Sequence, residues 1–172
     1  GKDAGVKVRT DDDLFAPSLQ GEARVEPLTQ GERPWELTSQ FYVAFFGGAL
    51  AVTAIAWLNA KRLRAPEETQ RWILILGGLG VVASVVVSYV LYGSDFRSAT
   101  RLGYRIVAVL LAGALYKLQQ PADRIYSFRS PVGEDEQYDS LWIPGLIAIL
   151  VGGALQLGII LVGVVLIDAV IG

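Results

Sequence analysis

The chain of 172 residues contains no cysteine, no histidine and no methionine. Without cysteine it has no disulfide, no thiolate ligand and no thiol nucleophile. Without histidine it lacks the commonest metal ligand and the side chain that ordinarily titrates nearest pH 7. We therefore expect no cofactor and no metal ion.

Charged residues are scarce as well. They make up 19% of the chain, whereas soluble domains have about 25%. Hydrophobic residues make up 52%, and the net charge is −2. This balance favours a protein surrounded by a lipid bilayer, and it gives no reason to expect nucleic acid as a partner.

Long apolar runs are what the sequence does contain. Residues 143–167 carry no charge, and Gln156 is their only strongly polar side chain. A helix needs about 20 apolar residues to cross a hydrocarbon core of about 30 Å. Because this run is longer, it predicts a transmembrane helix over about 142–168.

Three further segments have the composition of membrane spans: about 39–60, 72–92 and 102–118. The third contains an uncharged run of only 106–116, so a re-entrant or surface helix is its alternative. The connection 119–141 is expected to be irregular because it contains Pro121. The predicted fold class is all-α, a polytopic bundle of four transmembrane helices within the domain 39–172.

Residues 1–38 form a polar arm before the first span. The arm carries five basic and eight acidic residues and is interrupted by prolines. It has no helical or strand periodicity, so we expect it to be extended or disordered unless a partner orders it. Leu14 and Phe15 could anchor such a partner; the alternative is a solvated tail with a chance aromatic residue.

Small side chains recur at four-residue spacing in two of the spans. The residues are Gly80, Ser84 and Ser88 in the second span, and Ala148 and Gly152 in the fourth, where Gln156 continues the same face. Residues four apart share a helix face, and membrane helices associate through close packing and a few hydrogen bonds. Both stripes therefore indicate helix interfaces. Gly47 and Gly48 in the first span either break that helix or mark another close contact.

Four polar side chains lie in or beside the apolar runs. Gln156 either bonds across a helix interface or lines a pore. Asp168, the only acid within an apolar run, reaches the far interface, pairs with Arg101 or Arg105, or forms an ion or proton site. Ser84 and Ser88 have no base beside them, so no nucleophilic constellation is visible.

These features lead us to expect a non-catalytic accessory, assembly or scaffold subunit of a larger membrane complex. It would dock on other membrane subunits through its small-residue faces and its arm. The alternative is a small oligomeric channel or transporter with Gln156, Asp168 and Arg105 near the path. A membrane-embedded enzyme acting on lipid would need a polar cavity that the sequence does not indicate.

Lysine and arginine set the expected orientation, because basic residues in short loops stay in the cytoplasm. Four lie in the first connection and its flanks, and three in the third. We therefore expect both connections in the cytoplasm and both termini on the far side. The membrane is expected to be a bacterial inner membrane, with a thylakoid or other organelle membrane as the alternative.

Overall fold

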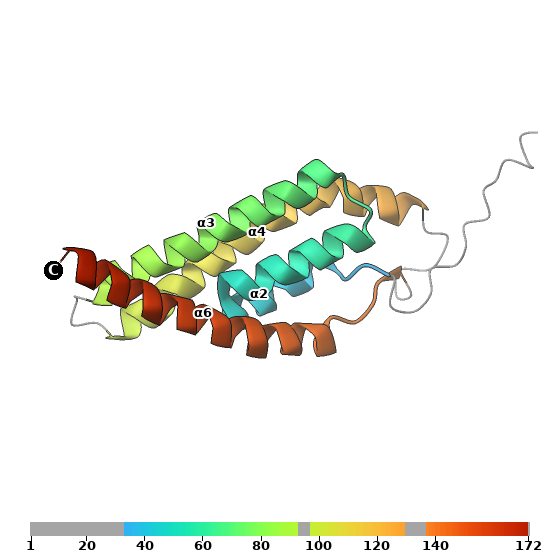
Figure 1. Ribbon diagram of the computed structural model, residues 1–172. Helices are drawn as coiled ribbons and strands as arrows, with labels where there is room; N and C mark the ends of the chain where they lie inside the picture. The colour runs from blue at the N-terminus through green and yellow to red at the C-terminus, as the bar shows by residue number, and fades with distance from the viewer. Residues whose placement is uncertain (1–32, 93–96, 130–136, 172) are drawn as a thin grey trace, which may run out of the picture.

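The computed structural model describes residues 33–92, 97–129 and 137–171 (Figure 1). In this part of the chain a short 3₁₀ helix precedes four α-helices: η1 (Leu37–Ser39), α2 (Gln40–Arg62), α3 (Glu67–Tyr92), α4 (Arg97–Arg129) and α6 (Trp142–Ile171). All four α-helices are long and apolar enough to cross a membrane, and the described residues form no strand. The predicted all-α fold class is confirmed. Leu14 and Phe15 lie outside the described residues.

The helix α4 extends further than the sequence predicts. The prediction that residues 119–141 are irregular is wrong for 119–129, because α4 continues through Pro121 to Arg129. Proline removes one backbone donor from a helix, and tertiary contacts can offset that loss. Here the hydroxyl of Tyr126 donates to the carbonyl of Gln137 at 2.9 Å, which ties the added turns to the chain before α6.

The helix α2 reverses direction at Gly48. This residue has φ +79° and ψ −170°, so the helix is two helices joined at a sharp break. Gln40 and Asn59 would lie about 28 Å apart in a straight helix. Instead, both side chains donate to the same oxygen, Gln119 Oε1, each at 3.2 Å. The segment is therefore a helical hairpin with halves 40–47 and 49–62, and its tip is Gly48 (Figure 1).

The α2 hairpin lies at the centre of the bundle. It packs against α3, α4 and α6, and α3 also contacts α4 and α6. More than half of the apolar window of α2 is buried, whereas only 11% of the α6 window is. Non-helical backbone is tolerated at membrane depth where protein covers it, and Gly47 and Gly48 are both buried.

Because α2 turns back, the described chain follows a different path from the predicted one. Residues 33–39 lie at the same end of the bundle as the first connection, since Trp35 N donates to Asn59 Oδ1 at 2.6 Å. The third connection lies there too, since Asp139 N donates to the carbonyl of Pro34 at 3.0 Å. The C-terminus lies at the opposite end (Figure 1). The described chain therefore starts beside the first and third connections, and the expectation that both termini lie opposite them does not fit this path.

Candidate functional site

The tip of the α2 hairpin is held by a side chain from α6. The break at Gly48 leaves the first N–H groups of the half 49–62 without partners in the helix, and lipid supplies none. Gln156 Oε1 accepts a hydrogen bond from Leu50 N at 2.7 Å. The Gln156 side chain is only 2% exposed, and its Nε2 has no partner within the described residues. Gln156 therefore caps the second half of the hairpin from another helix.

Glycines let α2 and α6 approach closely around this cap. A Cβ added at Gly152 would lie 2.8 Å from the Cβ of Ala51, and one added at Gly47 would lie 3.0 Å from the Cα of Ile149. Real Cβ atoms rarely come so close, so neither glycine has room for a side chain unless the helices move. Close approach brings Gln156 within hydrogen-bond reach of Leu50.

The stripe of Gly80, Ser84 and Ser88 faces the interior of the bundle. A Cβ added at Gly80 would meet Leu111 of α4 at 2.6 Å and Ala49 of the hairpin at 3.5 Å. Ser84 is buried and donates to the carbonyl of Gly80 at 2.8 Å. Ser88 is buried as well, and its Oγ has no partner in the described part of the chain.

At the open end of the hairpin, three buried amide side chains form a layer. Gln40 and Gln119 donate to each other, at 3.2 Å and 3.1 Å. Asn59 donates to Gln119 Oε1 and to the carbonyl of Trp35, while its own oxygen accepts from Trp35 N. This amide layer was not predicted from the sequence. In a straight span Gln40 and Asn59 would lie at opposite interfaces, so nothing in their spacing indicates that they meet.

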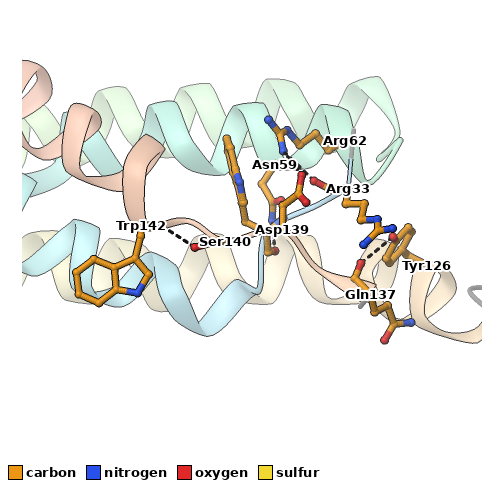
Figure 2. Close-up of polar contacts among 9 residues, drawn as sticks. Arg33, Asn59, Arg62, Tyr126, Gln137, Asp139, Ser140 and Trp142 are labelled. Carbon is orange, nitrogen blue, oxygen red and sulfur yellow. Dashed lines mark hydrogen bonds and ion pairs between the residues drawn. The ribbon is translucent and has the colours of Figure 1, made fainter. Parts of the chain in front are cut away.

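Outside the amide layer, four residues form a rim that joins the end of the arm to the first and third connections: Arg33, Trp35, Arg62 and Asp139 (Figure 2). Arg62 Nη1 donates to the carbonyl of Arg33 at 2.8 Å and lies 3.5 Å from Asp139 Oδ2. Its guanidinium carbon lies 3.9 Å from the ring centroid of Trp35. Trp35 and Asp139 also form an isolated parallel β-bridge. Since partly exposed ion pairs contribute little, the backbone bonds and the buried Trp35 ring hold this rim together.

Tyr126 and Tyr138 join the end of α4 to the segment that precedes α6. Tyr138 donates from its hydroxyl to Asp123 Oδ1 at 3.0 Å, and its ring lies 6.0 Å from that of Tyr126. Burial raises the pKa of Tyr138, and the carboxylate of Asp123 raises it further. The Tyr138 phenol therefore keeps its proton and remains a donor at neutral pH.

The structure does not bring Gln156, Arg105 and Asp168 together. Asp168 is exposed and lies about 18 Å further along α6 than Gln156. The guanidinium carbon of Arg105 lies 5.1 Å from the Phe45 ring centroid on the hairpin, and α2 and α3 lie between α4 and α6. Arg62 and Asp139 form an ion pair, whereas none joins Arg105 to Asp168 among the described residues.

The described residues contain no group of three acidic, histidine or cysteine side chains that could hold a metal ion. What they do provide is polar side chains bonded to other parts of the same chain, at the hairpin tip and in the amide layer. Comparison with protein-family models, with curated proteins and with solved structures gave no match for this chain.

Proposed function

We propose that this protein is a non-catalytic accessory, assembly or scaffold subunit of a larger membrane complex. The observation that carries the proposal is that its buried polar side chains form hydrogen bonds with other parts of the same chain. Gln156 caps the hairpin, and Gln40, Asn59 and Gln119 bond to one another. Such a bundle offers neighbouring subunits a fixed shape, because its interior contacts specify one arrangement of the helices.

The outer face of α6 supports docking within the membrane. Only four of its residues are buried: Gly145, Gly152, Gln156 and Ile160. Gly158 has no other group within 4 Å of the position where a Cβ would stand, and the same holds for Gly78 on α3 and Gly113 on α4. Exposed glycines allow the backbone of another helix to approach closely, which is how membrane helices associate.

The rim supports docking outside the membrane. The arm enters the described structure at Arg33, where Arg62, Trp35 and Asp139 hold it beside both connections. A soluble partner that bound the acidic arm would therefore be positioned next to this end of the bundle.

We also propose that this end of the bundle faces the cytoplasm. Its cations outnumber those at the other end: Arg33, Lys61, Arg62, Arg64, Arg71, Lys117, Arg124 and Arg129 against Arg97, Arg101 and Arg105. The positive-inside rule then favours a cytoplasmic arm and a C-terminus on the far side. A bacterial inner membrane is the proposed location, with an organelle membrane as the alternative.

Purification of the tagged full chain from its native membrane in a mild detergent tests the main proposal. We expect the same membrane proteins to co-purify at a fixed ratio in independent preparations. Recovery of a homo-oligomer alone, with ion flux after reconstitution into vesicles, would instead support a channel or transporter. One observation favours that alternative: Ser88 Oγ, Arg105 Nε and Gln156 Nε2 are buried without partners in the described residues.

A further inference from the structure

The outward face of α4 continues past the bundle to the end of the helix at Arg129 (Figure 1). In the membrane half of the helix, Ile106 and Leu110 are exposed on this face. Residues 117, 121, 124 and 128 follow at helical spacing on the same side, while Leu115 and Gln119 on the opposite side are fully buried. The exposed face is thus one stripe that runs from lipid-facing residues to the end of α4.

Aromatic side chains locate the membrane surface along this stripe. The rings of Tyr116 and Phe41 lie 6.2 Å apart, and those of Tyr42 and Trp142 lie 6.3 Å apart, so the starts of α2 and α6 are level with Tyr116. Trp142 is 80% exposed. Tryptophan and tyrosine gather at membrane interfaces, so residues after Tyr116 lie at headgroup depth or beyond.

Beyond that level, the stripe mixes cations with apolar side chains. Lys117 and Arg124 are exposed, and a shallow groove beside them is lined by Gln120, Pro121, Arg124, Ile125 and Phe128. Phe128 is 88% exposed. Exposed cations beside apolar side chains at headgroup depth suit the surface of a membrane that contains anionic lipid.

Lys117 and Arg124 have charge available for a ligand. Within the described residues neither forms an ion pair, and the nearby carboxylate of Asp123 accepts a hydrogen bond from Tyr138 on another face. We propose that this stripe binds an anionic phospholipid, with Lys117 and Arg124 on the headgroup phosphate beside the groove and an acyl chain along Ile106 and Leu110, on the hydrocarbon side of Tyr116. This site is independent of the proposed role in a complex.

Lipid retention by the full chain tests the proposal. The protein is purified in mild detergent, incubated with equimolar phosphatidylglycerol and phosphatidylcholine of identical acyl chains, and examined by native mass spectrometry. We expect the wild type to retain more phosphatidylglycerol. Each cation near an anionic membrane surface changes binding by about fivefold, so Lys117→Gln with Arg124→Gln should lower the retention ratio by about 25-fold.

The matched control is Lys61→Gln with Arg71→Gln, which removes two exposed cations from the same end of the bundle. It should leave the ratio close to that of the wild type. Leu110→Ser keeps the charge and should lower retention of both lipids alike. Size-exclusion elution and circular dichroism like those of the wild type verify that each variant is folded.

Three results would overturn the proposal. An equal loss in the control variant would mean that the cations act only through a diffuse field. Displacement of phosphatidylglycerol by excess inorganic phosphate would mean a simple anion site. Co-purification of a protein that is lost in Lys117→Gln with Arg124→Gln would mean that the stripe is a protein interface.

Discussion

Gly48 has φ +79° and ψ −170°, a region of backbone conformation that only glycine adopts readily. A Cβ added there would also stand 3.0 Å from Gln156 Oε1, the atom that caps the hairpin. Both effects act against any larger residue. The turn of α2 therefore depends on this one position more than on its neighbour Gly47, whose surroundings are tight but whose conformation is helical.

Gly48→Ala should destabilise the protein by about 1–3 kcal/mol, because a left-handed conformation strains any residue with a Cβ. Thermal unfolding in detergent measures this as a lower midpoint. The control is Gly78→Ala, which has open space around its Cβ position within α3. Alanine is favoured over glycine in a helix by up to about 1 kcal/mol, so the midpoint of this variant should stay level or rise. Equal midpoints for the two variants would contradict a special role for Gly48.

Gln156 is the second residue on which the hairpin depends, since its Oε1 accepts from Leu50 N in a buried setting. Gln156→Leu should destabilise the bundle by about 1–3 kcal/mol, the usual cost of leaving a buried donor without a partner. Leu157→Ala on the exposed side of α6 serves as the control and should change the unfolding midpoint less. A Gln156→Leu variant as stable as the wild type would mean that water or another group satisfies Leu50.

Sequence reasoning identified Gln156 and the glycine pair but could not join them. A glutamine in an apolar run predicts a hydrogen bond across helices, and the structure supplies one, to the backbone of a broken helix. The partner was not predictable, because a glycine pair in a membrane helix is equally compatible with a straight, closely packed helix. The amide layer was missed for the same reason, since Gln40, Asn59 and Gln119 meet only after α2 has turned back.

At the scale of the helices, hydropathy predicted the segments well and the path of one of them poorly. A window average counts apolar residues without regard to direction, so the hairpin of α2 has the hydropathy of a single span. A re-entrant helix was the alternative prediction for the third segment, because its apolar run is short. In the structure α4 is a long uninterrupted helix, and the reversal occurs in α2, where the apolar residues are more numerous.

Spin labels at Thr38→Cys and Lys61→Cys measure the reversal directly, because the natural chain has no cysteine. A straight helix would separate these positions by about 34 Å, whereas a hairpin should hold them within about 20 Å. The control pair is Glu67→Cys and Val90→Cys in α3, which has the same sequence separation and keeps one direction. That pair should give the long distance. Two equal long distances would disprove the hairpin.

At the scale of the whole molecule, the hairpin changes the number of times that the chain crosses the bundle from an even to an odd number. Three helices run the length of the bundle, and α2 enters and leaves at the same end (Figure 1). The start of the described chain and the C-terminus therefore lie at opposite ends. Four complete crossings would have placed them at the same end. This difference does not depend on which end faces the cytoplasm.

Labelling of single cysteines with a membrane-impermeant maleimide, in native membrane vesicles, tests whether the two ends of the described chain lie on opposite sides of the membrane. Glu36→Cys and Lys61→Cys should react from the same side, and Val170→Cys should react only from the other, because α6 carries it to the far end of the bundle. Permeabilised vesicles give the control, since all three positions should then react. In intact cells, the proposed orientation predicts reaction at Val170→Cys alone. Reaction of Glu36→Cys and Val170→Cys from one side, with Lys61→Cys on the other, would restore four crossings and contradict the hairpin.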